Sequence, residues 1–229
     1  MSGNGFNRLL SVILIIVVIL IVVALGFVGY DYVLKRYINT SDAAKEIEEI
    51  DKYIKENNPI AVEITDGNEN INSGSAEEAS NYQGSGATYN PNKKYGLKYK
   101  GYGVVGKIEL PAVGLQYPIL ETLTDANAID VSVAMQYGAG INEVGNTIIM
   151  GHNYRNGTFF GSNKRLSVGD KVYITDMSGK KIEYTIYKKY LTPQEDFSYA
   201  DRDTKGKREI TLVTCHTDNK YRLIIFARE

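Results

Sequence analysis

The last twenty residues hold the side chains best suited to covalent chemistry. They read ITLVTCHTDNKYRLIIFARE, residues 210–229, and place Cys215, the single cysteine of the chain, beside His216, one of two histidines. A thiol at the end of an apolar, strand-like run is either a buried core residue, which is the commoner situation for cysteine, or a nucleophile. The two possibilities differ in whether the sulfur is accessible and in what lowers its pKa.

Alternation along EITLVTC, residues 209–215, predicts where the sulfur points. Successive side chains of a strand point to opposite faces, so Ile210 and Leu212 share a face that Cys215 does not. The aliphatic pair is expected to face the core. Cys215 is therefore expected at the strand end on the outer or groove face, where a substrate can reach a thiol.

An accessible thiol also needs a neighbour that stabilises its charged form. An unperturbed thiol has a pKa near 8.5, and a nearby imidazolium or guanidinium lowers it. His216 is adjacent in sequence, but strand alternation aims its ring away from the sulfur unless a turn begins there. His152 instead ends the apolar run NTIIM and opens the polar loop GHNYRNGTFF. Catalytic groups are often held at such a junction, although a loop histidine is more often an ordinary surface residue.

Three short motifs together resemble those of the sortase family. TLVTC at 211–215 is similar to the TLxTC active-site strand of that family, and GHN at 151–153 matches its histidine after an apolar strand. Arg222 then opens the apolar strand that follows the cysteine, as the family's arginine does. The resemblance covers residues 101–229. It implies a mainly β fold, a closed β-barrel of about 7–8 strands with short helices.

The resemblance also implies roles for these residues. Cys215 would be the nucleophile, His152 the general acid and base, and Arg222 the residue that steadies the oxyanion or holds the substrate backbone. Arg228, at the far end of the last strand, is not expected to do so, and no orienting carboxylate is evident. Members of the family cleave an LPxTG-like sorting motif through a thioester and pass the acyl group to an amine of cell-wall precursor or of a pilin.

Two other hypotheses stay open from the residues alone. One is a cysteine peptidase that uses water as the acceptor. The other is a non-catalytic, surface-binding β-barrel in which Cys215 is structural.

The elements that would position these residues begin near residue 101. Short β-branched runs separated by turns predict strands. These runs are residues 103–110, 117–121, 146–152, 171–176, 181–191, 209–215 and 221–227. One helical stretch is expected near residues 124–136.

The N-terminal region predicts a membrane anchor. Residues 9–28, LLSVILIIVVILIVVALGFV, have Ser11 as their single polar side chain. As a helix they would span roughly 30 Å, the hydrocarbon thickness of a bilayer. We expect a cytoplasmic tail at 1–8 and an uncleaved transmembrane helix at 9–30; a cleaved signal peptide is the alternative. Flanking charges nearly balance, so the resemblance, rather than charge, implies a single-pass cell-membrane protein with its catalytic domain outside the cell.

Two segments are expected between anchor and barrel. A juxtamembrane segment, residues 31–58, contains an amphipathic helical pattern at 41–57, for which Ser41 could serve as N-cap. This helix is expected to pack on the chain's own domain rather than on a partner. Residues 59–100 are expected to be a flexible linker, because 65–94 are rich in Gly, Ser and Asn and almost lack aliphatic side chains.

Composition excludes several other classes. With 26 basic and 27 acidic residues the chain has no nucleic-acid footprint. A single cysteine rules out an intramolecular disulfide and a Cys-rich zinc site. Glu121, Asp125 and Asp130 could suggest a calcium site, but three acids on a loop and helix are more often solvated surface. No cofactor or metal is expected. The expected partners are sorting-signal peptides, an amine acceptor and, through residues 9–30, the lipid bilayer.

Overall fold

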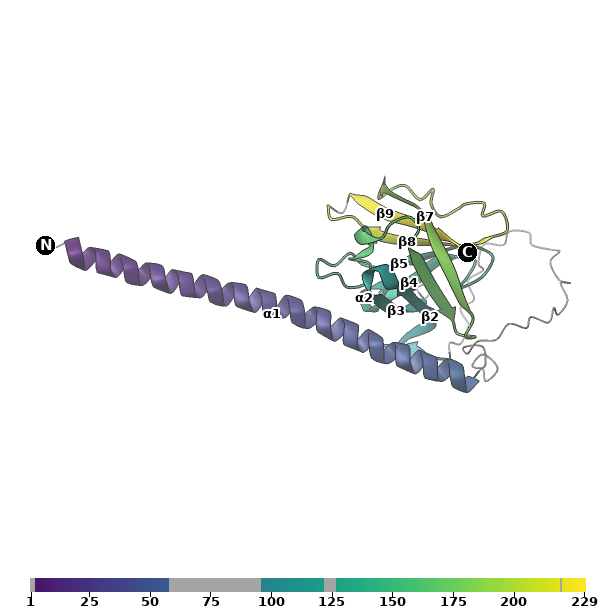
Figure 1. The fold of residues 1–229 in the computed structure, drawn as a ribbon, viewed down its shortest axis with the longest axis horizontal. Coiled ribbons are helices and arrows are strands. Elements are labelled where there is room, and N and C mark those ends of the chain that lie inside the picture. The colour runs from purple at the N-terminus through teal and green to yellow at the C-terminus, as the bar shows by residue number, and fades with distance from the viewer. Residues whose placement is uncertain (1–2, 58–95, 122–126, 219) are drawn as a thin grey trace. The chain divides into compact units, whose positions relative to one another are not determined.

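The computed structural model describes residues 3–57, 96–121, 127–218 and 220–229 (Figure 1). It divides into two compact units, Met1–Ser41 and Asp42–Glu229, and each is described by itself. The expected linker falls almost wholly outside the described residues. Its last residues do not, because Lys98–Tyr99 form the short strand β1, which pairs with β2. The ordered domain therefore begins before the expected boundary at residue 101.

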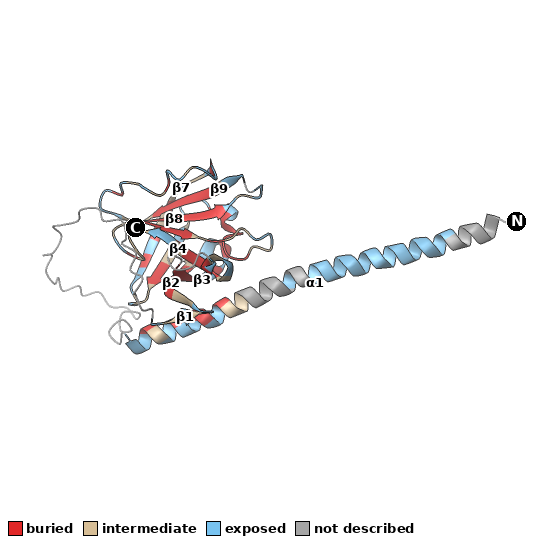
Figure 2. Cartoon of the chain, turned by 180° about the vertical axis from the view of Figure 1, so that it is seen from behind, coloured by how far each residue is buried: buried red, intermediate tan, exposed pale blue. Residues whose placement is uncertain are grey.

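Helix α1 (Gly3–Asn57) carries the apolar segment. Leu10–Tyr30 are 21 helical residues with a mean hydropathy of 3.5, and none of them is buried. Figure 2 shows this stretch as exposed. This helix is long and apolar enough to span a membrane, as the expected anchor at 9–30 requires. A signal sequence near the N-terminus meets the same two criteria. The expected helix start at Ser41 is wrong, because α1 runs through this position without a break.

Eight strands form a closed barrel in the second unit. They are β2 (Tyr102–Leu110), β3 (Leu115–Glu121), β4 (Val133–Gly138), β5 (Gly145–Met150), β6 (Lys171–Asp176), β7 (Lys181–Pro193), β8 (Arg208–Cys215) and β9 (Tyr221–Arg228). Neighbouring strands follow the order β2-β3-β4-β5-β8-β9-β7-β6, and β6 pairs back with β2. Two 3₁₀ turns, Pro111–Val113 and Asn163–Arg165, complete the connections. The expected mainly β, closed barrel is confirmed.

The prediction of a helical stretch near residues 124–136 is wrong for most of the described residues in that range. Helix α2 covers only Ala128–Val131, and residues 122–126 lie outside the described part of the chain. β4 begins at Val133 and pairs in parallel with β3, with Ile119 opposite Val133. Pairing with a distant strand has overridden the local helical pattern, since backbone hydrogen bonds to β3 and β5 satisfy this segment.

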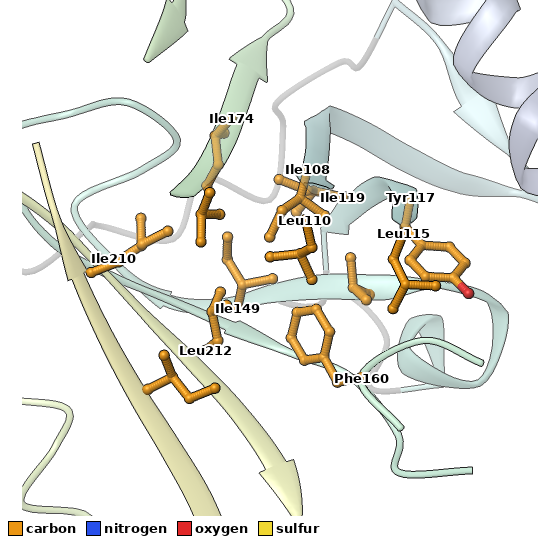
Figure 3. Close-up of a cluster of buried hydrophobic side chains, with 14 of the residues drawn as sticks. Ile108, Leu110, Leu115, Tyr117, Ile119, Ile149, Phe160, Ile174, Ile210 and Leu212 are labelled. Carbon is orange, nitrogen blue, oxygen red and sulfur yellow. The ribbon is translucent and has the colours of Figure 1, made fainter. Parts of the chain in front are cut away.

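The core lies inside the barrel and follows the alternation of the strands. Ile210 and Leu212 of β8 point inward, where they join Ile149 of β5 in the main cluster of buried side chains (Figure 3). Val213, the residue between Leu212 and Thr214, belongs to a second cluster with Ile224 and aromatic side chains. The prediction that Ile210 and Leu212 face the core is confirmed.

The last part of α1 packs on the barrel, as the sequence predicted. Ile47, Ile50 and Ile54 are buried in one cluster with Val104, Leu120, Ala128 and Ala134. Burying a side chain of this size stabilises a fold by about 1.5–3 kcal/mol. At the edge of the contact Lys107 donates to the carboxylate of Asp51. The residues that open the second unit are therefore part of the barrel's packed structure.

Glu46 makes this contact sensitive to pH. Its side chain is buried on the same helix face, and one carboxyl oxygen has no hydrogen-bond partner. Burial, and secondarily the charge of Glu49, raise the pKa of Glu46 from 4.5 to about 7. The folded state thus holds this proton at pH values where the unfolded chain has lost it. The free energy of unfolding must fall as pH rises between these two values and stay lower above them.

Glu46→Gln is therefore expected to remove this pH dependence. Between about pH 5 and pH 8 the wild-type chain should lose on the order of 1 kcal/mol more stability than the variant. Urea unfolding at several pH values measures the difference. Glu48→Gln, at an exposed position of the same helix, is the matched control and should follow the wild type. Parallel curves for wild type and Glu46→Gln would contradict the assignment.

Candidate active site

Two parallel strands bring the predicted histidine and cysteine segments to one edge of the barrel. β5 and β8 pair with Met150 opposite Val213, so the residues that follow both strands emerge together. The pairing continues past β5: Gly151 donates its N–H to the carbonyl of Val213 at 3.1 Å. Thr214 returns a bond from its hydroxyl to the carbonyl of Gly151 at 2.7 Å.

Cys215 is the last residue of β8 and is exposed. Its neighbours Val213 and Thr214 are buried, so the thiol emerges where the strand leaves the packed region. The expected accessible position is confirmed, and the hypothesis of a buried core cysteine is wrong. What the thiol does remains a prediction.

His152 is held beside this strand end by its own loop. Asn153, the next residue, donates from its side-chain amide to the carbonyl of Cys215 at 2.8 Å. Gly151, the residue before His152, packs directly against Phe160. A Cβ at this position would lie 2.8 Å from the phenyl ring, so a larger residue would not fit. The His152 ring lies 5.2 Å from that of Tyr154, and its Nε2 is 2.7 Å from a carboxylate oxygen of Asp130.

Arg222 reaches the site from the opposite side of β8. It lies on β9, antiparallel to β8, and its Cα partner is Cys215. Directly opposed residues of such a pair have Cβ atoms about 4.5–5.5 Å apart. One guanidinium nitrogen donates to the hydroxyl of Tyr199 at 3.0 Å, and the guanidinium carbon lies 5.1 Å from the ring centroid of Phe197.

His216 belongs to the turn between β8 and β9. Its N–H donates to the carbonyl of Tyr221 at 2.7 Å, and its Nδ1 lies 3.2 Å from a carboxylate oxygen of Asp218. A turn thus begins at His216, which is the exception named for the strand-alternation argument, and the ring is engaged within that turn.

The segment between β7 and β8 contributes a pocket that the sequence did not reveal. A cavity of about 300 Å³ is lined by Gln136, Tyr137, Ile148, Phe197, Tyr199 and Ala200. Tyr199 is buried, while Phe197 remains exposed at the rim. The same two aromatic residues contact Arg222, so the pocket adjoins the guanidinium. Its walls come from three separate parts of the chain, and no local pattern in the polar loop could have indicated it.

A buried charge network fixes this segment. Arg202 donates to the carboxylate of Glu209 at 2.5 Å and to the hydroxyl of Tyr187 at 2.8 Å. Glu209 is buried and also accepts from Arg228 at 2.9 Å. The guanidinium carbon of Arg202 lies 3.7 Å from the ring centroid of Phe226. Arg228, at the other end of β9 from Arg222, therefore has a structural partner in Glu209.

Two of the three acidic residues considered for calcium, Glu121 and Asp130, lie within the described residues. Glu121 is buried, Asp130 contacts His152, and Asp125 lies outside the described residues. Within the described ranges no group of three or more His, Cys, Asp or Glu side chains could hold a metal ion. Asp130 is instead the residue that sequence reasoning missed, because its place beside His152 depends on the unexpected strand β4.

Comparison with known proteins gives one consistent family. The model of the sortase domain matches residues 108–229, more than half of the chain. Sortase A of Bacillus anthracis is 31% identical over 126 residues, which cover 53% of this chain and 58% of that protein. Sortase A of Listeria monocytogenes is 30% identical over 123 residues, covering 53% and 54%. The chain thus matches little more than half the length of these relatives.

Solved sortase structures also align with this chain, at lower identity. Sortase A from Corynebacterium diphtheriae aligns with 25% identity and a TM-score of 0.49, over 56% of this chain and 61% of that chain. A sortase D5 transpeptidase of Clostridium perfringens aligns with 26% identity and a TM-score of 0.49, over 55% and 78%.

Arg202→Ala is expected to loosen the segment that lines the pocket. The change removes one of the two guanidinium partners of a buried carboxylate, which should lower the free energy of unfolding by about 2 kcal/mol. Denaturant unfolding measures the loss. Lys207→Ala, at an exposed position of the same segment, is the control and should change stability by no more than about 0.5 kcal/mol. Equal stability of the two variants would show that the network does not hold the segment.

Proposed function

This chain belongs to the sortase family, and from that premise we propose that it is a membrane-anchored cysteine transpeptidase. The observation that carries the proposal is the exposed thiol of Cys215 at a strand end, with Arg222 as its cross-strand partner and the loop of His152 bonded to its carbonyl. A nucleophile, an acid–base group and a fixed cation around one open position are what acyl transfer through a thioester requires.

The proposed reaction runs in two halves. The Cys215 proton passes to His152, and the sulfur attacks the carbonyl carbon of the scissile peptide bond. When that C–N bond breaks, the leaving amine takes the proton from His152 and an acyl thioester remains on Cys215. An acceptor amine then attacks the thioester and gives up a proton to His152, which passes it to the departing sulfur and so restores the thiol. Atoms and charges balance without a cofactor.

Arg222 is suited to hold the carbonyl oxygen on which negative charge develops. A guanidinium has five N–H donors in a rigid plane, so its bond to Tyr199 leaves others for a substrate oxygen. The contacts with Tyr199 and Phe197 fix the direction of that plane. A preorganised donor of this kind stabilises the transition state more than a mobile one.

The substrate we propose is an LPxTG-like sorting signal. Its apolar residues upstream of the scissile bond would need an apolar pocket near Arg222, and the cavity lined by Tyr137, Ile148 and Phe197 has this character and place. The acceptor we propose is an amine of cell-wall precursor or of a pilin subunit.

The location we propose is the cell membrane, with the N-terminus in the cytoplasm and the barrel outside. The apolar helix Leu10–Tyr30 supports the anchor by its length and hydropathy. A membrane-held enzyme and a membrane-held substrate meet at raised effective concentration, which favours capture of an acceptor amine.

Covalent capture tests the function. The full chain in detergent micelles, mixed with a small library of sorting-motif peptides, should gain the mass of the acyl fragment at Cys215, and added triglycine should appear in the product. Cys215→Ala should form no adduct. Cleavage that never incorporates the amine would identify a peptidase instead. A thiol that forms no adduct and is alkylated no faster than that of a model peptide would identify a non-catalytic barrel.

The two histidines provide a second test. His152→Ala should lower kcat/KM for thioester formation by about a hundredfold or more, because it removes the acid–base group. His216→Ala should stay within about threefold of wild type, since its ring is engaged in the turn with Asp218. Equal losses in the two variants would contradict the assignment of His152.

A further inference from the structure

Strand register brings a carboxylate to His152 from a part of the chain that no motif includes. β4 and β5 are antiparallel, with Ala134 opposite Met150. Residues just before β4 therefore lie beside residues just after β5. Asp130 and His152 occupy these two extensions, and a carboxylate oxygen of Asp130 lies 2.7 Å from Nε2 of the imidazole.

The carboxylate is carried by a fixed piece of backbone. Ala128 of α2 is fully buried, and Ser132 donates from its N–H to the carbonyl of Ala128 at 3.1 Å. The hydroxyl of Ser132 donates to the carbonyl of Pro118 on β3 at 2.7 Å. Asp130 lies between these two anchored residues. A short side chain on an anchored backbone loses little entropy in the contact, unlike the long side chains of most surface ion pairs.

The chemistry of the pair assigns the imidazole protons. An ionised carboxylate only accepts hydrogen bonds, so the nitrogen that it contacts must carry a hydrogen. In neutral imidazole one nitrogen is a donor and the other an acceptor, and a bond to one nitrogen selects the tautomer. The contact therefore favours the form with hydrogen on Nε2 and the lone pair on Nδ1.

We propose that Asp130 is a positioning residue that keeps a proton on Nε2 of His152 and so makes Nδ1 the atom that exchanges protons with Cys215 and with the amines. This inference rests on the proposed function. Nδ1 takes the proton from the sulfur and passes it to the leaving amine when the peptide bond breaks. It then takes a proton from the acceptor amine and returns it to the departing sulfur. The hydrogen on Nε2 stays on the ring throughout and is donated to Asp130.

The charge of Asp130 also suits the intermediate state. When Nδ1 has taken the thiol proton, the imidazolium holds two hydrogens and a positive charge, next to a carboxylate at 2.7 Å. Bonds in which both partners are ionised are about twice as strong as neutral ones. The Asp130 carboxylate also acts on a neighbouring phenol. Burial, and secondarily this negative charge, raise the pKa of Tyr154 above its usual value.

Nitrogen NMR of the full chain in detergent micelles tests the tautomer directly. The chain has only two histidines, so selective ¹⁵N labelling of histidine yields two sets of ring signals, and His216→Gln assigns them. At alkaline pH, where imidazole rings are neutral, His152 should show hydrogen on Nε2. Asp130→Ala should mix the two tautomers, and Asp130→Glu should restore the first. Asp218→Asn, which changes the other histidine–carboxylate contact, should move only the signals of His216.

Kinetics of the same variants separate positioning from folding. Asp130→Ala should lower kcat for thioester formation roughly tenfold with KM nearly unchanged, less than the loss expected when the acid–base group itself is removed. Asp130→Glu should recover most of kcat. A loss that appears in KM alone, or that the glutamate variant does not recover, would overturn the positioning role.

The NMR outcome distinguishes this inference from the function on which it rests. Hydrogen on Nδ1 in the wild type, or a tautomer that ignores Asp130→Ala, would overturn the inference even if thioester formation is normal. A second outcome is possible: the tautomer depends on Asp130, but no peptide forms an acyl-enzyme. That result would refute the proposed function and leave the assignment of the Nε2 proton standing.

Discussion

The parallel pairing of β5 with β8 is the constraint on which the site depends. It places the loop after Met150 beside the end of the cysteine strand, although Asn153 and Cys215 are 62 positions apart in sequence. Parallel neighbours need a long crossover, and here β6 and β7 lie within it. β9 then pairs with β8 from the other side and brings Arg222 opposite the cysteine. Two ladders of backbone hydrogen bonds thus meet at the end of β8.

Closure of the barrel determines on which side chemistry can occur. Aliphatic and aromatic side chains pack together in the interior. The candidate site residues lie at the edge of the barrel, and Tyr199 and Phe226 pack in a separate cluster with Val213 and Ile224. The segment that carries Tyr199 is tied down through Arg202 and Glu209. The Arg202–Glu209 ion pair thus holds the segment that carries Tyr199, and the Tyr199 hydroxyl accepts a hydrogen bond from Arg222.

The end of α1 shows how the same chain joins a very apolar helix to a globular domain. Its isoleucines cover the outside of β2 and β3, which would otherwise leave an apolar patch exposed. Glu46 lies in this contact with a raised pKa. We therefore expect the stability of this contact to fall as pH rises through the raised pKa of this carboxyl.

Local patterns were enough to identify much of this protein. The alternation in ITLVTC determined that Ile210 and Leu212 face the core while Cys215 does not, because side-chain direction in a strand has a period of two. The length of the apolar run determined a helix of membrane-spanning size, since rise per residue is constant. Seven of the eight barrel strands were readable from β-branched runs. These properties depend only on residues close together in the chain.

Tertiary structure alone decided the contacts that make the site specific. Val133 and its neighbours became a strand because β3 and β5 were available as partners, and that strand carried Asp130 to His152. The pocket beside Arg222 likewise has walls from three distant segments. The register of a sheet is set by all of its strands together, so no window of sequence contains it. For this reason the accessible position of Cys215 could be predicted from the sequence, whereas the carboxylate beside His152 could not.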